Sequence, residues 1–198
     1  MQIVFATGNL HKVREVNDIV ASLMQGQEHQ VELLPYSGPE PIEDGTTFLE
    51  NALIKARAAS AQTGMPAIAD DSGLAIEIMG GSPGIFSARW SGSRDDEQNR
   101  QLVLAQLADV KREHRAAAFV CTIALVDGEN EVSFTGIWPG RIAHEATGEH
   151  GFGYDPIFIP EGFEISAAEL EPELKNQLSH RSLALEQLAS YLAAQLSD

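Results

Sequence analysis

The chain has 198 residues, of which 43% are hydrophobic and 21% charged, as expected for one packed domain, or one domain with a second lobe. Its 13 Lys and Arg residues against 29 Asp and Glu residues give a formal net charge of −16. This charge argues against a broad face for nucleic acid or for an acidic membrane surface, because both require clustered basic residues. A small anionic ligand is compatible with it if the site holds cationic side chains, a metal ion, or both.

The sequence also bears on compartment and processing. No apolar run approaches the roughly 20 residues needed to cross a membrane, and the N-terminus has neither the basic nor the long apolar segment of a secretion signal. The single cysteine, Cys121, lies in an apolar stretch and is expected to be a buried core thiol. We therefore expect a soluble protein of the cytoplasm with no membrane partner.

The first half of the chain predicts strands and helices in alternation. A β-branched run over residues 3–6 predicts a strand, and apolar side chains then recur at helical spacing, namely Val13, Val16, Val20 and Leu23. A second helix is predicted over residues 47–63. Residues 66–69 predict a short buried strand, which is interrupted by Asp70-Asp71-Ser72-Gly73 and resumes over residues 74–79.

The second half predicts further strands between two helices. Asp95, followed three residues later by Gln98, is typical of a capping box and predicts a helix that carries Leu102, Val103, Leu107 and Val110. Strands are predicted over residues 118–126 and 131–138, joined as a hairpin, and over 156–159. Ser179 is expected to cap a final helix with a stripe of Leu185, Leu188, Leu192 and Leu196. Strands and helices intermixed in this way predict an α/β fold with a mixed sheet.

The first candidate site is the segment Thr7-Gly8-Asn9-Leu10-His11-Lys12, which joins the first strand to a helix N-terminus. Such a junction presents free backbone N–H groups and the positive end of the helix dipole, and both suit phosphate. Lys12 adds a mobile positive charge. The spacing of a Walker A loop is missing, and an ordinary strand–helix turn is the alternative.

The second candidate is Asp70-Asp71-Ser72-Gly73, which places two adjacent carboxylates in an otherwise apolar stretch. A buried carboxylate is costly unless it is paired or bound to a metal, so a hard cation such as Mg²⁺ is a natural partner. Neighbouring side chains of a strand point to opposite faces. One carboxylate could therefore meet a ligand while the other anchors the turn or adds a metal contact. The alternative is a solvated Asx-type turn.

The second helix and the loop before it carry further charged residues. Asn51 and Lys55 are spaced i, i+4 and therefore share one helix face, next to Glu50. The loop segment Glu43-Asp44-Gly45 supplies acids just upstream. Most such residues merely solvate a helix surface, and that alternative stays open.

The segment Gly151-Phe152-Gly153-Tyr154-Asp155-Pro156 combines two aromatic side chains with glycines that allow a ligand to approach the backbone closely. Aromatic side chains commonly stack on nucleobases. A tight turn packed on the core explains the same residues equally well.

His180 and Arg181 follow directly on the Ser179 cap, where cations oppose the helix dipole and need a compensating partner. A bound anion or a carbonyl-rich ligand would supply one, and so would a carboxylate such as Glu171 or Glu173.

Lysine is scarce in this chain. The four lysines are Lys12, Lys55, Lys111 and Lys175, and three of them lie in or beside the candidate segments. On an acidic protein this distribution favours ligand contacts over solubilising residues.

Taken together and in this order, these segments resemble the inosine/xanthosine triphosphate pyrophosphatase family from the N-terminus to the last helix. The matching stretches are Thr7-Gly8-Asn9 with Lys12, Phe48-x-Glu50-Asn51-Ala52 with Lys55-Ala56, Ala69-Asp70-Asp71-Ser72-Gly73-Leu74, Pro83-Gly84-Ile85-Phe86-Ser87-Ala88-Arg89, Phe152-Gly153-Tyr154-Asp155-Pro156, and Lys175 with Ser179-His180-Arg181.

The resemblance implies a single nucleotide pyrophosphatase domain over residues 1–198, a mixed sheet flanked by helices, with a nucleotide-binding cleft between two lobes. It implies a homodimer that hydrolyses ITP, dITP and XTP to the monophosphate and pyrophosphate with Mg²⁺, removing deaminated purines from the nucleotide pool. Asp71 would be the general base and a metal ligand, and Glu43 a second metal ligand. The implied substrate contacts are Thr7, Gly8, Asn9, Leu10, His11, Lys12, Ser72, Phe152, Gly153, Tyr154, Asp155, Lys175, His180 and Arg181.

Three other functions are weighed against this one. A non-catalytic nucleotide sensor could use the same pocket, although the paired acids Asp70 and Asp71 favour an enzyme. A phosphatase of the haloacid dehalogenase type expects Asp-x-Asp rather than adjacent acids. A Maf-like nucleotide pyrophosphatase would catalyse the same reaction on other nucleotides.

Overall fold

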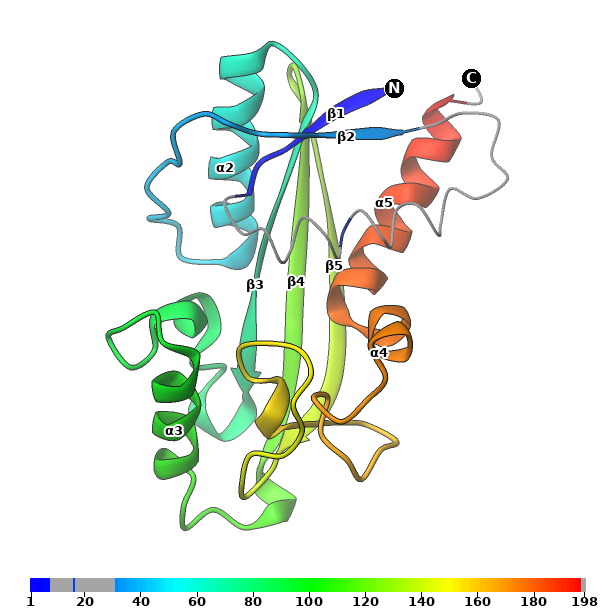
Figure 1. Cartoon of the computed structure of the whole chain (residues 1–198). Coiled ribbons are helices and arrows are strands. Elements are labelled where there is room, and N and C mark those ends of the chain that lie inside the picture. The colour runs from blue at the N-terminus through cyan, green and yellow to red at the C-terminus, as the bar shows by residue number, and fades with distance from the viewer. Residues whose placement is uncertain (8–15, 17–30, 197–198) are drawn as a thin grey trace. The chain divides into compact units, whose positions relative to one another are not determined.

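The computed structural model describes residues 1–7, 16 and 31–196, which fold around a mixed six-stranded sheet (Figure 1). The strand order is β2-β1-β3-β4-β5-β6. The strands are β1 Gln2–Phe5, β2 Glu32–Pro35, β3 Ala67–Ile76, β4 Ala116–Asp127, β5 Asn130–Ile142 and β6 Phe158–Pro160. Because β1 is parallel to β2 and β3 whereas β5 and β6 are antiparallel, the prediction of a mixed α/β sheet is confirmed.

Four α-helices of the described residues 31–196 accompany the sheet, and the chain divides into two compact units. The helices are α2 Phe48–Thr63, α3 Asp96–Gln106, α4 Pro172–Leu178 and α5 His180–Leu196. None of the helices in the described part of the chain is long and apolar enough to cross a membrane. Unit 1 comprises Met1–Asp71, Cys121–Gly136 and His180–Asp198, and unit 2 comprises Ser72–Val120 and Ile137–Ser179.

In unit 1 the strands pack on a helix at each face of the sheet (Figure 1). The core on the α2 face consists mainly of small side chains, namely Val4, Ala6, Ala52, Ala56, Ala59, Ala67, Ala69 and Ala124. The core on the α5 face is larger, with Ile3, Phe5, Ile68, Cys121, Ile123, Leu185, Leu188 and Leu192. Along each strand, successive side chains alternate between these two cores, because a strand has a period of two residues. Cys121 is the buried core thiol that the sequence predicts.

The N-terminus of α2 lies where the sequence predicts it. The Thr47 hydroxyl accepts a hydrogen bond from the Glu50 N–H at 3.1 Å, which satisfies one free donor of the first turn. The Glu50 carboxylate accepts from the Thr46 hydroxyl and N–H at 2.7 and 2.6 Å, and these bonds hold the pKa of Glu50 below its ordinary value. The helix ends at Gly64, whose φ of 67° suits glycine.

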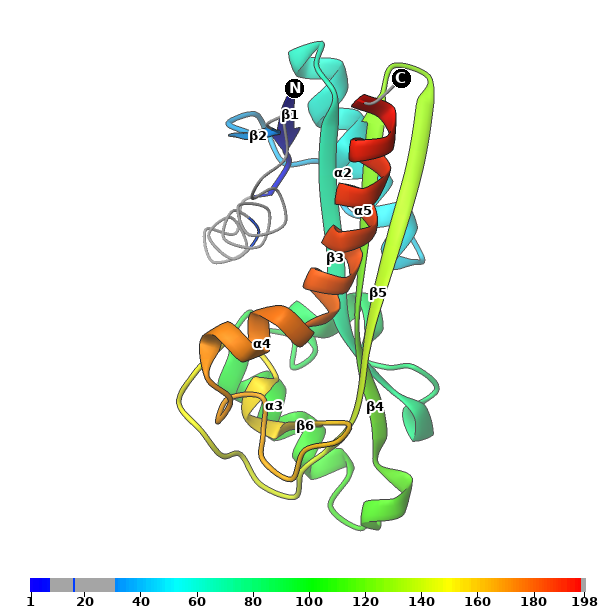
Figure 2. The ribbon, with the colours of Figure 1, turned by 90° about the vertical axis from the view of Figure 1, so that its right-hand side faces the viewer.

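Helix α5 lies beside β5 in both ribbon views (Figures 1 and 2). The side chain of Gln187 donates to the Thr135 carbonyl at 2.8 Å. A Cβ atom at Gly136 would lie only 2.0 Å from the His180 carbonyl oxygen. Glycine at position 136 therefore lets the first turn of α5 approach β5 closely, which fixes the start of this helix.

The core of unit 2 is built around an aromatic cluster. The rings of Phe119 and Phe158 meet edge to face with centroids 4.6 Å apart, and Trp138 lies 5.4 Å from Phe158. Val103 and Leu107 pack helix α3 and its C-terminal end against the same cluster. Unit 2 thus has a core of its own that holds α3 in place.

Several predicted elements differ from those observed. Strand β3 is continuous, so the predicted interruption over residues 70–73 is wrong; the two acidic side chains have partners on helices, and the strand does not need to turn. The hairpin of β4 and β5 is confirmed, with both strands longer than predicted. The strand expected over residues 156–159 starts later, at Phe158, after a 3-10 turn over Asp155–Ile157.

Helical predictions show a similar pattern. The helix after Asp95 ends at Gln106, so Leu107 and Val110 lie beyond it. Helix α4 is not predicted. The helix expected after the first strand lies outside the described residues, apart from Val16, which is helical and buried.

Candidate active site

Asp71 lies on β3 and faces helix α2 in unit 1. It follows Ala67 and Ala69 on the face that packs on this helix. The side-chain amide of Asn51 donates to Asp71 Oδ2 at 3.1 Å, and Lys55 Nζ lies 3.9 Å from Asp71 Oδ1. Asn51 and Lys55 reach the same carboxylate because residues four apart share a helix face. The pattern noted in the sequence therefore belongs to the surroundings of Asp71.

Asn51 also holds the loop that precedes α2. Its Oδ1 atom accepts a hydrogen bond from the Gly45 N–H at 2.9 Å, while its amide nitrogen serves Asp71. A Cβ atom at Gly45 would lie 2.7 Å from Asn51 Oδ1, so the absence of a side chain permits this approach. The acidic loop and Asp71 are thus joined through one buried amide.

Lys55 connects the two carboxylates that the resemblance assigns to metal binding. Its Nζ atom lies 3.1 Å from Glu43 Oε1, in addition to its contact with Asp71. Burial alone would lower the pKa of Lys55, but the negative charges of Asp70, Asp71 and Glu43 outweigh burial and raise it. The ammonium group therefore stays charged between Glu43 and Asp71.

Asp70 points to the opposite face of β3, towards α5. Its Oδ2 lies 3.8 Å from Nε of Arg181, and both side chains are 2% exposed. Asp70 therefore supplies a carboxylate beside the cation in the first turn of α5. Neighbouring aspartates on one strand thus face two different helices.

The aromatic segment of unit 2 is held by a buried ion pair. The carboxylate of Asp155 accepts hydrogen bonds from Lys175 Nζ at 2.7 Å and from the Phe152 N–H at 2.8 Å. Lys175 also lies over the Phe152 ring, 5.2 Å from its centroid. Lys175, Asp155 and Phe152 therefore form one cluster, although they come from two segments of the chain.

Tyr154 points away from this cluster into the core of unit 2. Its hydroxyl donates to the Ser87 carbonyl at 2.8 Å. Burial, and then the charge of Asp96, raise the pKa of Tyr154, so the phenol remains a donor. Tyr154 anchors the segment and does not present its hydroxyl to solvent.

The remaining predicted site residues are placed as follows. Thr7 is half-buried just after β1, and Ser72 is half-buried on β3 in unit 2. His180 is 8% exposed at the start of α5 in unit 1. Gly8, Asn9, Leu10, His11 and Lys12 lie outside the described residues. The resemblance assigns no role to Asn51 or Lys55, although their spacing and the scarcity of lysine already single them out in the sequence.

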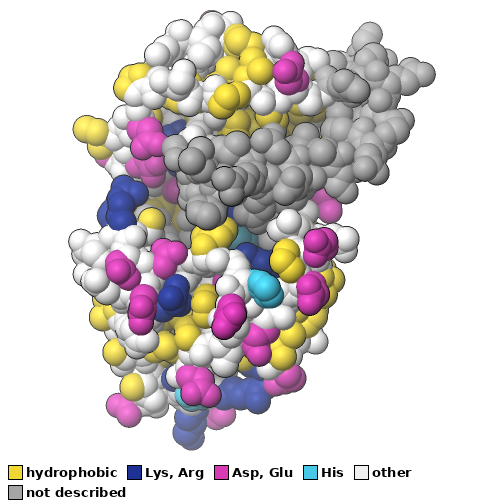
Figure 3. Space-filling model, in the orientation of Figure 1, with side chains coloured by type: hydrophobic (Ala, Val, Ile, Leu, Met, Phe, Trp, Pro, Cys, Tyr) yellow, Lys and Arg dark blue, Asp and Glu magenta, His cyan; other side chains and the backbone are white. Residues whose placement is uncertain are grey.

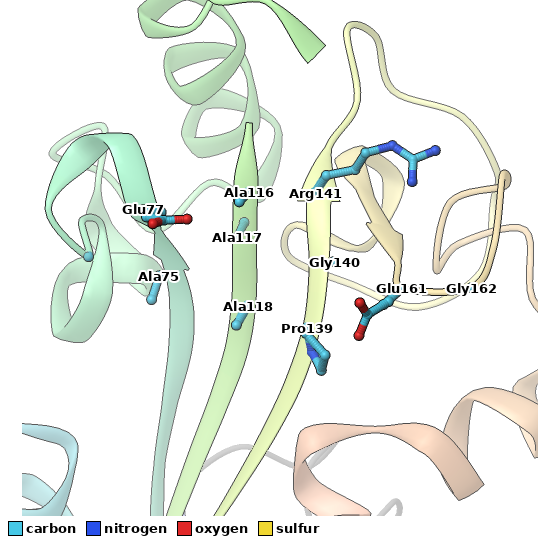
Figure 4. A pocket seen from close by; sticks show the side chains of 11 residues that line it. Ala75, Glu77, Ala116, Ala117, Ala118, Pro139, Gly140, Arg141, Glu161 and Gly162 are labelled. Carbon is cyan, nitrogen blue, oxygen red and sulfur yellow. The ribbon is translucent and has the colours of Figure 1, made fainter. Parts of the chain in front are cut away.

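The surroundings add two observations. Among the described residues, no three His, Cys, Asp or Glu side chains gather as a ready metal site. A hollow of about 590 Å³ in unit 2 is lined by small strand residues with Glu77, Arg141 and Glu161 at its edges (Figure 4). It contains none of the predicted site residues, so it is not the candidate active site.

Comparison with known proteins bears on the whole chain. A family model described as the Ham1 family matches residues 3–191. A protein of Leifsonia xyli subsp. xyli named dITP/XTP pyrophosphatase is 52% identical over 98% of this chain and 96% of its own length. One of the same name from Vibrio parahaemolyticus is 46% identical over 100% of this chain and 99% of its own length.

Solved structures show the same similarity in three dimensions. A HAM1 protein from Coxiella burnetii has a TM-score of 0.88 and 41% identity, covering 98% of this chain and 99% of that chain. A nucleoside-triphosphatase, dITP/XTP pyrophosphatase, from Mycobacterium abscessus has a TM-score of 0.77 and 45% identity, covering 95% and 97%.

Proposed function

The chain belongs to the Ham1 family, and from this premise we propose that it hydrolyses ITP, dITP and XTP to the monophosphate and pyrophosphate. The relatives named dITP/XTP pyrophosphatase support this substrate class. The single observation that carries the proposal is the cluster around the Asp71 carboxylate. Asn51 and Lys55 contact this carboxylate, and Lys55 also contacts Glu43. The role of such an enzyme is to remove deaminated purines from the nucleotide pool.

In this proposal Asp71 is the general base. Its carboxylate takes a proton from water as the water oxygen attacks the α-phosphorus, and the bond to the α–β bridging oxygen breaks as pyrophosphate leaves. Asn51 fixes one carboxylate oxygen, so the direction of the other is defined before substrate binds. A carboxylate is suited to this step without a large pKa rise when a metal assists the water.

Glu43 and Asp71 are the proposed metal ligands, with Mg²⁺ as the metal. Both carboxylates already approach one cation, the Lys55 ammonium, so their positions fit a shared positive charge. When bound, Mg²⁺ neutralises charge on the triphosphate and lowers the pKa of the attacking water. Lys55 would then be free to contact a phosphate oxygen.

The remaining predicted residues divide between the phosphates and the base. Thr7 and the segment over residues 8–12 would bind the triphosphate through backbone N–H groups and Lys12. The Phe152 ring, 36% exposed, would stack on the purine. Arg181 would donate to the 6-keto and N7 atoms of hypoxanthine or xanthine, whereas adenine presents a donor amine there.

The substrate contacts assigned to Ser72, Gly153, Tyr154, Asp155, Lys175 and His180 stay predictions. So do the homodimer, the cytoplasmic location and the lack of polymeric nucleic acid as a partner.

The test is pyrophosphate release from a panel of ITP, dITP, XTP, GTP, ATP, dTTP and UTP, with Mg²⁺ and after chelation by EDTA. We expect turnover of the first three with Mg²⁺ and its loss on chelation. Asp71→Asn should lower turnover of ITP by at least about a thousandfold, because an amide cannot accept the proton, while ITP binding stays measurable. Wild-type turnover by this variant, or release mainly from dTTP and UTP, would contradict the proposal; binding of ITP without any turnover by the wild type would favour a nucleotide sensor.

A further inference from the structure

Two side chains of α3 hold Gly153 in unit 2 from both sides of its backbone. The Asp96 carboxylate accepts a hydrogen bond from the Gly153 N–H at 2.8 Å. One terminal nitrogen of the Arg100 guanidinium donates to the Gly153 carbonyl at 2.7 Å. Asp96 and Arg100 are four residues apart and so share one face of the helix. More than fifty residues separate them from Gly153, so this clamp is a tertiary contact.

The clamp adds to a local turn around Gly153, in which the Asp155 N–H donates to the Phe152 carbonyl at 3.2 Å. The φ of Gly153, 59°, lies in the left-handed region. Glycine adopts this region readily, but it adopts many other backbone conformations as readily. No atom lies within 4 Å of the position that a Cβ would take, so packing does not restrain it. The neighbouring residues are already tied, Phe152 by its N–H to Asp155 and Tyr154 by its hydroxyl to Ser87. The clamp on Gly153 completes the fixation of the segment.

Helix α3 is itself well anchored, so it can act as a rigid support. Asp95 caps its first turn by accepting from the Gln98 N–H at 2.9 Å. The buried Asn99 side chain accepts from the Ser91 N–H at 2.7 Å and donates to the Ala88 carbonyl at 3.4 Å. Contacts built on such an element hold a loop more precisely than contacts from another loop.

We propose that Asp96 and Arg100 are positioning residues that hold the segment Phe152–Asp155 ready for the nucleotide base and thereby set nucleotide affinity. This inference rests on the proposed function, in which the Phe152 ring stacks on the purine. Neither side chain needs to touch substrate, because each acts through the backbone of Gly153. Their contribution therefore belongs to binding, and the hydrolytic step at Asp71 is independent of it.

The expected change in nucleotide affinity follows from the fraction of time that the segment Phe152–Asp155 spends in the conformation that binds the base. If removal of the Arg100 contact lowers this fraction to about one tenth, the apparent dissociation constant of a base-containing ligand rises about tenfold. A ligand without a base does not use the segment, so its affinity should not change.

The experiment compares Arg100→Ala with wild type, using IMP and inorganic pyrophosphate as probes in calorimetry and ITP in kinetics. We expect the dissociation constant of IMP and the KM of ITP to rise about tenfold, with pyrophosphate affinity and kcat within twofold of wild type. Arg100→Lys, which keeps a charged donor, should recover part of the loss. Arg112→Ala is the matched control, because this arginine of unit 2 is 60% exposed and pairs with Glu164 on the surface.

Hydrogen exchange supplies a readout that does not depend on activity. In Arg100→Ala, the amides of residues 152–154 should exchange at least about tenfold faster, whereas Arg112→Ala should leave them unchanged. Unchanged exchange and unchanged IMP affinity would overturn the proposal, and so would an equal loss of IMP and pyrophosphate binding. If wild-type protein binds no IMP and hydrolyses no ITP, the proposed function fails, and with it the role in base binding, even where faster exchange shows that the clamp orders the segment.

Discussion

Asp70 and Asp71 are neighbours in the chain but meet different partners, and the reason is the two-residue period of a strand. Asp71 shares its face with the alanines that pack on α2, and there it meets Asn51 and Lys55. Asp70 faces α5 and Arg181, where both side chains are removed from water. The stability lost when one partner of an ion pair is removed depends more on the burial of the pair than on the distance between the two charges. A buried charge cannot be solvated once its partner is gone.

The pair of Asp70 and Arg181 provides a test of this argument. Asp70→Asn keeps the shape of the side chain but leaves the Arg181 guanidinium without the charge of this carboxylate. We expect the free energy of unfolding to fall by about 3 kcal/mol, as measured by urea denaturation without Mg²⁺ or nucleotide.

Glu131→Gln is the matched comparison. Its carboxylate binds Arg57 in two short hydrogen bonds of 2.6 and 2.7 Å, but the side chains are 34% and 54% exposed. Because water replaces the lost contact, this change should lower the free energy of unfolding clearly less than Asp70→Asn does. A larger loss from Glu131→Gln than from Asp70→Asn would show that distance, and not burial, governs these pairs.

At the scale of elements, local signals in the sequence predict those parts of the fold that local chemistry decides. The helix predicted over residues 47–63 matches α2 to within one residue, and the predicted hairpin matches β4 and β5. Helix α4 escapes prediction because its seven residues bury only Lys175, so it has no apolar stripe. The continuity of β3 escapes prediction because Arg181 and the side chains of α2, which accommodate the two aspartates, are distant in sequence.

The candidate site shows the same division between local and distant information. The shared face of Asn51 and Lys55, and the opposite directions of Asp70 and Asp71, follow from helix and strand periods. The contact of Arg100 with Gly153 does not, since an arginine on a helix surface is ordinary and its partner lies more than fifty residues away. Sequence patterns therefore indicate which residues can carry chemistry, while the tertiary structure indicates which residues hold them in position.

Arg115 shows how one side chain can tie elements together in unit 2. It is 1% exposed and donates to the carbonyls of Leu107, Val110 and Ala143. It thereby joins the C-terminal end of α3 to the chain after β5, and its positive charge suits the end of a helix. These three partners are all carbonyl oxygens, and their fixed positions suit the planar guanidinium group.

Replacing Arg115 should therefore destabilise unit 2 strongly. Arg115→Met leaves one buried and two partly buried carbonyls without their donor, and we expect a loss of about 3 to 5 kcal/mol in the free energy of unfolding, measured with urea. Arg115→Lys should recover only part, because one ammonium cannot reach all three acceptors in the same geometry. The exposed Arg94 is the control, and Arg94→Met should change stability by less than about 0.5 kcal/mol. Equal effects at the two positions would contradict the proposed tie.

At the scale of the whole molecule, the net charge of −16 coexists with a proposed polyanionic substrate. Acidic side chains are scattered over the face seen in Figure 3 and do not form a single patch. Three cations with a proposed role in binding are instead largely buried, since the side chains of Lys55 and Arg181 in unit 1 are 14% and 2% exposed and that of Lys175 in unit 2 is 10% exposed. Each lies beside a carboxylate. The positive charge of these side chains is thus paired and acts at short range, whereas the net charge of the chain is negative.

This arrangement predicts that salt promotes the encounter with a nucleotide. At low ionic strength the approaching triphosphate experiences the net negative charge, because the Debye length is about 20 Å at roughly 20 mM salt and falls to about 8 Å at 150 mM. At saturating Mg²⁺ we expect kcat/KM for ITP to rise about threefold from 20 to 150 mM KCl. A protein that attracts its substrate through its overall charge would show a decrease.

A charge variant isolates the cause of this salt effect. Changing the exposed Glu113, Glu129, Glu145 and Glu149 to glutamine removes four negative charges without touching a proposed site residue. In this variant kcat/KM at 20 mM KCl should rise and the increase with salt should become smaller, because less repulsion remains to be screened. Parallel salt curves for the variant and the wild type would show that salt acts on the site itself. A fall of kcat/KM with salt in the wild type would mean that the internal cations, and not the net charge, govern the approach of the nucleotide.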